Sequence, residues 1–550
     1  MRCGFFYFWK GSSLEATSAF AFAGMVSHQD QPGQFPSKIS VIFPAMIKKL
    51  ALLILLVSVF SCSEETQKKP NIIIFLVDDM GWQDTSVPFW SEKTHFNERY
   101  QTPNMERLAR EGMKFTQAYA TSVCSPTRVS LITGMNAARH RVTNWTLEKD
   151  VQPVADDAFL QQPDWNVNGL TPVEGVENAV FVTPLPEILK GAGYRTIHVG
   201  KAHFGAIGTP GSEPLNLGFE VNVAGHAAGA PGSYYGTMNF GNSADKSVWA
   251  VPGLEKYHGQ DIYLTEALTL EAQHHVDEAI SAQKPFFLYL AHYAVHTPIQ
   301  GDDRFLQKYY DSGMDSTEAK YASMVEGMDK SLGDIMNMLE EKEVDDNTII
   351  LFMSDNGGLS AVARGGERHT HNFPLSSGKG SAREGGIREP MIVKWPGKVA
   401  TNVSTSNPVI IEDFFPTVLE MAGVDHLETI QKVDGLSFIN VLQGEDGDYE
   451  RPLYWHYPNR WGPVGPGIAS TSTVRQGDWK LIYYHKDRSF ELFNLEKDIS
   501  EENNMASSNP NKLKELAQKL TDYLKSVDAQ MPIDKATGQL VEWPIEVLNH

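Results

Sequence analysis

The sequence predicts an α/β fold: a large, doubly wound, mixed but mainly parallel sheet flanked by helices, then a smaller C-terminal α+β domain with a short antiparallel sheet. Three observations predict it. Apolar runs of strand length alternate with longer stretches of helical periodicity. The apolar runs are continuous, as in strands buried on both faces. After about residue 451 the pattern changes to short strands and one helix.

Five apolar runs are the predicted strands of the large sheet: 71–77 (NIIIFLV), 194–200 (YRTIHVG), 285–291 (PFFLYLA), 347–353 (NTIILFM) and 390–395 (PMIVKW). A helix is predicted over 102–112, which starts with Thr-Pro and ends with glycine, and another over 317–340, whose apolar residues share one face.

The C-terminal part has its own pattern. Strands are predicted at 479–484 and 491–495, and a helix at 511–527. We therefore expect a main catalytic α/β domain over 71–445 and an α+β subdomain over 446–550.

Residues 46–62 have the pattern of a lipoprotein-type signal peptide. Two lysines precede an apolar run too short to span a bilayer, and Cys62 follows it. Cys62 would be the lipidated first residue of the mature chain, with 63–70 as a spacer and 1–45 as an upstream extension from a misassigned start. The bulky Phe60 leaves ordinary cleavage nearby open, and a core helix is the other alternative. We expect export to a bacterial cell envelope, either lipid-anchored to the outer membrane (surface or periplasmic face) or in the periplasm.

The composition excludes several kinds of partner. A formal net charge of -21 argues against nucleic acid and against an anionic membrane surface, so we expect membrane contact only through the lipid anchor. Three cysteines in 550 residues are too few for a disulfide framework.

Acidic and amide side chains follow two of the predicted strands. Asp78 and Asp79 come after 71–77, and Asp355 and Asn356 come just after 347–353. Ligands bind at the carboxyl edge of such sheets, where these side chains would meet and repel one another. A hard divalent cation resolves the repulsion, and all-oxygen ligands favour Ca²⁺ or Mg²⁺ over zinc. Taken alone, either pair could merely cap a turn or helix.

Basic side chains follow other strands. Lys201 and His203 come after 194–200, and His296 comes shortly after 285–291. A glycine-rich loop over 364–388 gathers more basic residues, including Lys379. In a chain with an acidic total charge, these groups would form a local binding site for an anion.

The stretch TSVCSPTRVSLITG (121–134) predicts a helix that begins near Ser125 and ends at Gly134. Cys124 lies at its N-terminus, where backbone N–H groups and the helix dipole favour an anion. Arg128 lies one turn later. A free cysteine packed in the core is one alternative. A thiol nucleophile is another, but no base accompanies it, and a soft thiolate suits a hard cation poorly.

The segment CSPTR (124–128) resembles the C-x-P-x-R signature of the formylglycine-dependent (type I) sulfatases of the alkaline phosphatase superfamily, which include bacterial polysaccharide sulfatases. Between about residues 70 and 528 further motifs follow in the family's order: DDMGW (78–82), GKAHFG (200–205), HTP (296–298), DNGG (355–358), GKG (378–380), EGGIR (384–388), VRQGDWKLI (474–482) and LFNLEKDISEENN (492–504).

The resemblance implies that a maturation enzyme oxidises Cys124 to formylglycine and that the hydrated aldehyde attacks sulfur. One hydroxyl would displace the alcohol, and the second would drive elimination of sulfate. The resemblance also implies a Ca²⁺ site, with Mg²⁺ less expected, held by Asp78, Asp79, Asp355, Asn356 and residue 124. The implied roles of the other residues are as follows: Arg128 stabilises the ionised hydrate, Lys201 and Lys379 bind sulfate oxygens, His203 assists hydrate turnover, and His296 donates a proton or hydrogen bond to the leaving oxygen.

The predicted function is therefore a sulfuric ester hydrolase that acts on a sulfated oligosaccharide or polysaccharide. Algal polymers such as ulvan, carrageenan or fucoidan are expected sources, and host glycosaminoglycans are another. Departures from the family pattern at Ala202, Met135, Ser376-Ser377 and Arg383 leave the substrate contacts open.

An insertion over 146–183 with Trp145 and Trp165 beside or within it, and a glycine-rich segment over 224–235, are hypothetical sugar-contacting walls. A phosphonate monoester or phosphodiester hydrolase of the same superfamily, or a non-catalytic carbohydrate-binding lipoprotein, is the alternative function.

Overall fold

The computed structural model describes residues 68–154, 156–242, 247–359, 371–424, 428–462 and 465–549. The chain divides into two units, Met1–Gln67 and Lys68–His550, and everything below concerns the second. The predicted extension, signal peptide and lipidated Cys62 lie outside the described residues. Residues on both sides of the predicted boundary at 445/446 belong to this second unit, so the boundary stays a prediction.

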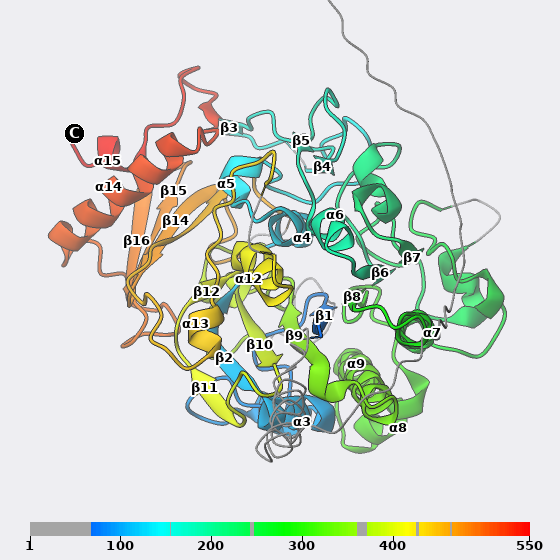
Figure 1. Cartoon of the computed structure of the whole chain (residues 1–550). Helices are drawn as coiled ribbons and strands as arrows, with labels where there is room; N and C mark the ends of the chain where they lie inside the picture. Colours follow the sequence, from blue (N-terminus) through cyan, green and yellow to red (C-terminus); the bar gives the residue numbers. More distant parts are fainter. Residues whose placement is uncertain are drawn as a thin grey trace, which may run out of the picture. The chain divides into compact units, whose positions relative to one another are not determined.

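A mixed sheet forms the centre of the fold (Figure 1). Its order is β11-β2-β10-β9-β1-β8-β6-β7, and β12 also pairs with β2. The strands are β1 (Asn71–Val77), β2 (Met113–Tyr119), β6 (Arg195–Gly200), β7 (Val221–Val223), β8 (Phe286–Ala291), β9 (Thr348–Ser354), β10 (Arg388–Lys394), β11 (Val403–Thr405) and β12 (Val409–Ile410). Only β10 runs antiparallel to its neighbours, β9 and β2. The predicted fold class, mixed but mainly parallel, is confirmed.

Helices cover both faces of this sheet (Figure 1). The side chains of β1 point alternately to the two faces, so β1 contributes to a hydrophobic core on each side. Ile73, Phe75 and Val77 pack in one core with α3 (Pro103–Glu111), α7 (Leu264–Ser281), α8 (Asp303–Asp311) and α9 (Ser316–Glu341). Ile72, Ile74 and Leu76 pack in the other core with α4 (Cys124–Thr133), α6 (Leu185–Gly191) and α12 (Phe414–Met421). The sheet is therefore doubly wound.

The C-terminal part is an antiparallel sheet under a helix, drawn orange to red in Figure 1. Its strands, in order, are β13 (Leu453–Tyr457), β14 (Thr471–Gln476), β15 (Trp479–Tyr484) and β16 (Ser489–Asn494). Helix α14 (Pro510–Ser526) packs on one face of this sheet. On the other face, Trp455 and Ile482 pack against Tyr119 of β2. This arrangement confirms the predicted C-terminal antiparallel sheet.

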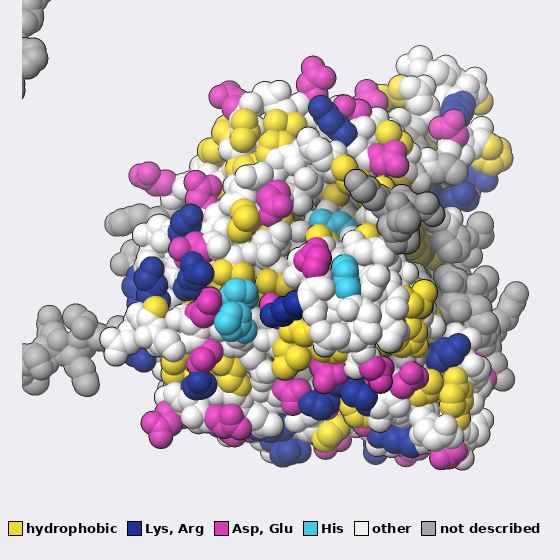
Figure 2. Space-filling view, turned by 90° about the vertical axis from the view of Figure 1, so that its right-hand side faces the viewer, with side chains coloured by type: hydrophobic (Ala, Val, Ile, Leu, Met, Phe, Trp, Pro, Cys, Tyr) yellow, Lys and Arg dark blue, Asp and Glu magenta, His cyan; other side chains and the backbone are white. Residues whose placement is uncertain are grey.

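The remaining elements are short: α2 (His95–Arg99), α5 (Ala137–His140), α11 (Glu384–Ile387), α13 (Ile439–Leu442), α15 (Pro544–Val547), β3 (Leu160–Gln161), β4 (Leu170–Thr171), β5 (Val180–Phe181), β17 (Ile533–Asp534), η1 (Pro210–Ser212), η2 (Pro214–Leu217), η3 (Gly236–Gly241), η4 (Glu255–Tyr257), η5 (Asp345–Asn347) and η6 (Ile411–Asp413). Within the described ranges, no helix combines the length and the apolar character needed to cross a membrane. On the face in Figure 2, Lys and Arg side chains are interspersed with Asp and Glu side chains.

Candidate active site

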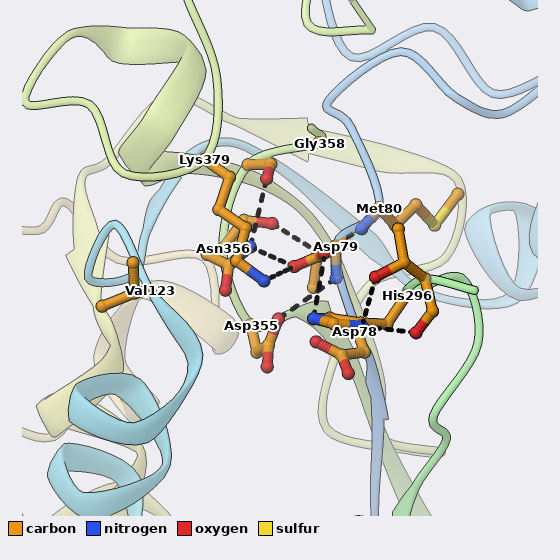
Figure 3. A network of polar contacts seen from close by, with 12 residues as sticks. Asp78, Asp79, Met80, Val123, His296, Asp355, Asn356, Gly358 and Lys379 are labelled. Carbon is orange, nitrogen blue, oxygen red and sulfur yellow. Dashed lines mark hydrogen bonds and ion pairs between the residues drawn. The ribbon is translucent and has the colours of Figure 1, made fainter. Parts of the chain in front are cut away.

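The acidic residues that follow β1 and β9 come together because these strands are parallel neighbours, with Val77 opposite Ser354. Asp78 and Asp79 continue from β1, and Asp355 and Asn356 continue from β9 (Figure 3). All four side chains are at most 1% exposed. The backbone N–H of Asp79 donates to Oδ1 of Asp355 over 3.2 Å, which links the two strand ends.

Three oxygen atoms in this cluster are buried without a hydrogen-bond partner among the described residues: Oδ1 of Asp78, Oδ2 of Asp79 and Oδ1 of Asn356. Unpaired buried acceptors are costly, so native structures rarely leave several in one place. Ligand atoms of Asp78, Asp79 and His296 also lie within 4.8 Å of one another. Carboxylate and carboxamide oxygens are the donors that Ca²⁺ and Mg²⁺ prefer. The residues present therefore fit a hard divalent cation.

Each carboxylate in the cluster is also paired with one buried cation. Nζ of Lys201 lies 2.6 Å from Oδ2 of Asp78, and Nζ of Lys379 lies 2.5 Å from Oδ1 of Asp79. Arg128 donates from Nε and Nη2 to Oδ2 of Asp355 over 3.0 and 2.8 Å. Burial and the Asp355 carboxylate raise the pKa of Asp78 despite its contact with Lys201. An added cation would counter that shift.

Helix α4 begins at Cys124, one residue earlier than predicted, after the N-cap residue Val123, whose side chain offers no cap. Cys124 is 4% exposed and lines a cavity of about 910 Å³. Three bonds hold the segment before it: Ser122 N–H to Tyr457 Oη (2.8 Å), Trp455 Nε1–H to Ala120 O (2.8 Å) and Gly380 N–H to Ser122 O (2.7 Å). Strand β13 thus positions the helix N-terminus that carries Cys124.

The cavity brings four of the predicted catalytic residues together, since Cys124, His203, His296 and Lys379 all line it. Arg128 and Lys201 lie beneath the lining, fully buried, and Nη1 of Arg128 donates to the Lys201 carbonyl over 2.9 Å. The site therefore places a residue at a helix N-terminus and Lys379 in the cavity lining, with two more buried cations and the oxygen-rich cluster beside it.

Residues 70–424 match the family model for sulfatases, and residues 379–530 match the model for the C-terminal part of N-sulphoglucosamine sulphohydrolase. The chain belongs to the sulfatase family. A sulfatase of Formosa agariphila is 31% identical over 541 residues, covering 87% of this chain and 93% of the relative. Human N-acetylgalactosamine-6-sulfatase is 32% identical over 412 residues, covering 70% and 68%.

Solved structures agree with this membership. The crystal structure of Ps i-CgsB in complex with k-i-k-neocarrahexaose has a TM-score of 0.65 and 28% identity to this sulfatase, and the match covers 86% of this chain and 95% of that one. The family identifies the protein as an enzyme, which decides against a non-catalytic binding lipoprotein.

Both histidines among the described lining residues of this sulfatase's cavity have a pKa below the usual value. His203 donates from Nε2 to the carbonyl of Thr146 over 2.8 Å, and Nδ1 has no partner. Burial and Lys201 lower the pKa of His203. His296 donates from Nδ1 to the Thr297 carbonyl over 2.8 Å, and burial and Lys379 lower its pKa to about 3. Nε2 of His296 then has a lone pair, 3.6 Å from Oδ2 of Asp79, so it can donate a proton only after the ring takes up a second one.

Part of the glycine-rich segment 224–235 lines the cavity, and its contact with a sugar stays a prediction. Gly229 to Gly232 line the cavity, and a Cβ on Gly229 would come within 2.4 Å of Cε1 of His203. Only glycine at position 229 allows the backbone to lie this close to the His203 ring. Trp145 also lines the cavity. The hypothesis for Trp165 is wrong, because its ring is 3% exposed and packs in the core beneath α4.

The predicted basic patch is smaller than expected among the described residues. Lys379 reaches the site, but Arg383 pairs with Glu491 at 2.7 Å and Arg388 pairs with Glu384 at 3.3 Å. The patch's Arg364, Arg368 and His369 lie outside the described residues. His292, also near a strand end, is buried and contacts Ser331 Oγ at 2.9 Å, so it takes no part in the site.

Sequence reasoning missed Trp249 and Trp461, which line the cavity. Trp461 lies in a glycine- and proline-rich stretch between two C-terminal strands, and such loops often carry function. That composition is the signal that could have pointed to it.

Proposed function

We propose that this sulfatase hydrolyses a sulfate ester of a carbohydrate with a formylglycine hydrate at position 124, in a site that also holds Ca²⁺. The observation that carries the proposal is the set of unpaired buried oxygens on Asp78, Asp79 and Asn356, beside the cavity that Cys124 lines. Asp355 would complete the Ca²⁺ shell together with residue 124. Bound Ca²⁺ would polarise the sulfate group and lower the pKa of the hydrate.

The charges of the site suit this chemistry. Three carboxylates face three cations, so the cluster is neutral by formal count. A divalent cation adds two positive charges. An ionised hydrate and a monoanionic sulfate ester together add two negative charges, so the loaded site stays neutral. Mg²⁺ would satisfy the same count, but it demands a more regular octahedral shell.

In the proposed reaction, one hydroxyl oxygen of the hydrate forms a bond to sulfur while the ester oxygen leaves with the sulfur–oxygen bond electrons. Lys379 and Lys201 would bind the sulfate oxygens, and Arg128 would hold the attacking oxygen. The second hydroxyl then loses its proton, the aldehyde re-forms, and the carbon–oxygen bond to sulfate breaks. Water rehydrates the aldehyde. His296, once protonated at Nε2, would give that proton to the leaving oxygen so that it departs as an alcohol, and Nδ1 of His203 could accept the proton that the second hydroxyl loses.

The peptide that contains position 124 tests the nucleophile. Trypsin would release FTQAYATSVCSPTR (115–128) from protein made in a host with a formylglycine-generating maturation enzyme. We expect a peptide lighter by the thiol-to-aldehyde difference, which a carbonyl-reactive probe traps. Cys124→Ala should lose both the trapped peptide and sulfate release. An intact cysteine in active wild-type enzyme would overturn the proposal.

The names of the relatives support a choice of carbohydrates to test. The mammalian relatives are N-acetylgalactosamine-6-sulfatases, and Ps i-CgsB was crystallised with a neocarrahexaose. Algal polysaccharide fragments, with ulvan and carrageenan as candidates, and glycosaminoglycan fragments form the panel to screen, with released sulfate as the readout. Aryl phosphate and aryl phosphonate belong in the same panel, because faster turnover of either would favour the alternative hydrolase.

We also propose that the protein is exported and anchored through a lipid on Cys62. The sequence of 46–62 supports this proposal. Labelled palmitate should enter the wild-type protein but not Cys62→Ala, and cell fractionation should place the wild type in the envelope. Unlabelled wild-type protein would contradict the anchor.

A further inference from the structure

The catalytic cavity has a second wall that the chemistry at residue 124 does not use. Among the described lining residues, this wall consists of tryptophan rings, prolines, a valine, an alanine and glycine backbone, with the uncharged polar Ser247 and Thr297. Its three tryptophans come from three separate parts of the chain: Trp145 follows α5, Trp249 precedes η4, and Trp461 follows β13. All three rings are half-buried.

Trp461 lies next to the group expected to hold sulfate. Its ring packs on Gly380, where a Cβ would come within 2.1 Å of Cε3, and Nζ of Lys379 lies 5.8 Å from the ring centroid. A sugar that carries the sulfate would therefore meet this ring directly.

Trp249 is held by its backbone. Its carbonyl accepts from Gly232 N–H over 2.6 Å, and its N–H donates to Ser247 Oγ over 3.2 Å. Gly232 and Gly241 touch each other, since a Cβ on Gly232 would lie 2.8 Å from Cα of Gly241. The indole can be truncated without removing any of these backbone contacts.

The charge of the lining is unusual for a site that takes an anion. Lys379 is the one permanent cation among the described lining residues, and no carboxylate is among them. Lys201 and Arg128 are buried beneath the lining in ion pairs. A second anionic group on the bound sugar would lose its hydration without gaining a cationic partner among the described lining residues, in a protein of net charge -21.

We infer that this aromatic wall is a binding subsite for a sugar ring that carries one sulfate and no other charged group, such as a neutral hexose, and that it disfavours a uronate or a doubly sulfated ring. The C–H face of a neutral sugar packs on indole, which has a large apolar face and an edge with one donor. The inference rests on the proposed sulfatase chemistry and selects among its substrates.

Three substrates test it on the mature holoenzyme: an aryl sulfate, a neutral oligosaccharide with one sulfate per ring, and a matched oligosaccharide in which the sulfated ring also bears a carboxylate or second sulfate. We expect kcat/KM for the neutral oligosaccharide to exceed that for its charged counterpart at least tenfold. Trp249→Ala should lower kcat/KM for the neutral oligosaccharide about tenfold more than for the aryl sulfate.

Val248→Ala is the matched control, because Val248 is the exposed neighbour of Trp249 and lies outside the cavity lining. Val154→Lys adds a cation to the wall and should improve turnover of the charged oligosaccharide relative to the neutral one, whereas Val154→Met should not. If Trp249→Ala does not fold, Trp249→Leu, which keeps an apolar side chain without the indole face, provides the same comparison.

Equal turnover of the neutral and charged oligosaccharides would overturn the inference. So would an equal loss on the aryl sulfate and the oligosaccharide in the tryptophan variants, because a stacking subsite acts only on substrates that reach it. Wild-type enzyme that turns over none of the three substrates would instead reject the proposed function, so the two failures are distinguishable.

Discussion

At the scale of single residues, the proposed cation site depends on the backbone and the two carboxylate oxygens of Asp79. Asp79 has its backbone in the left-handed region, with φ of 62°, which turns the chain as soon as β1 ends. One of its carboxylate oxygens accepts from Lys379 and from Asn356, and the other has no hydrogen-bond partner among the described residues. The sequence predicted the ligand types because two acidic or amide pairs end two apolar strands. It could not predict which oxygen is already taken, because that depends on side-chain packing.

A buried glutamate that does not line the cavity gives a prediction about pH. Glu412 in η6 is 4% exposed, accepts from Asn136 Nδ2 over 2.7 Å with one oxygen, and has no partner for the other. Burial and the neighbouring Asp413 raise its pKa to about 8, with Arg451 opposing. In the unfolded chain it titrates near 4.3. Between these two pKa values the folded protein therefore binds one proton more than the unfolded chain does. The stability that this proton binding contributes is lost as pH rises from the lower pKa value through the higher one.

The Glu412→Gln side chain cannot ionise. As pH rises from 5 to 9, the unfolding free energy of this variant should therefore increase relative to that of the wild type, by up to a few kcal/mol, and its melting temperature should increase with it. The measurement is thermal unfolding of both proteins at pH 5, 7 and 9 in saturating Ca²⁺. Glu420→Gln, at an exposed position on α12, is the control and should follow the wild type. A constant difference between Glu412→Gln and wild type across this range would contradict the raised pKa.

At the scale of elements, five apolar strands of the central sheet were predictable, whereas β2 and the short β7, β11 and β12 were not. β1 and β9 are unbroken apolar runs, and every residue in them is buried. β2 (MKFTQAY) mixes buried and half-buried residues, and its polar residues made it hard to identify from the sequence. The antiparallel direction of β10 was equally inaccessible, because one short apolar run looks the same in either direction. The sequence also could not predict that Trp165 is buried in the core and that Trp461 lines the cavity, because tertiary packing decides the exposure of each side chain.

Strand β13 gives a prediction at this scale, because it holds the segment before Cys124. Tyr457→Phe removes the acceptor for the buried Ser122 N–H, and an unpaired buried donor costs about 1–3 kcal/mol. We expect a lower melting temperature and a fall in kcat of about tenfold for the folded enzyme, with KM nearly unchanged, because a misplaced reacting group costs catalysis rather than binding.

Tyr483→Phe is the matched control for this prediction. Tyr483 of β15 is equally buried and donates to the Glu542 carbonyl over 2.8 Å, in the hydrophobic core between the C-terminal sheet and α14. It should lose stability without a matching loss of kcat. If both variants lost kcat to the same degree, or if Tyr457→Phe kept its full kcat, β13 would have no positioning role.

At the scale of the whole molecule, the acidic charge and the proposed cation site are linked. A net charge of -21 raises the local concentration of divalent cations, and this effect weakens as salt screens the field. The ion pairs within the cluster are buried and screened far less. Calcium affinity should therefore fall as ionic strength rises, while the cluster itself stays intact.

Metal removal tests that link in the intact enzyme. Binding to the folded state alone stabilises it by about 2.7 kcal/mol when the ligand is at 100 times its Kd. EDTA should lower the melting temperature by several degrees and abolish sulfate release, and Ca²⁺ should restore both better than Mg²⁺. Asn356→Ala removes one unpaired oxygen, so its melting temperature should respond less to Ca²⁺, whereas Glu412→Gln should respond as the wild type does. Full activity and an unchanged melting temperature after exhaustive chelation would mean that the unpaired oxygens of Asp78, Asp79 and Asn356 serve a purpose other than holding a cation.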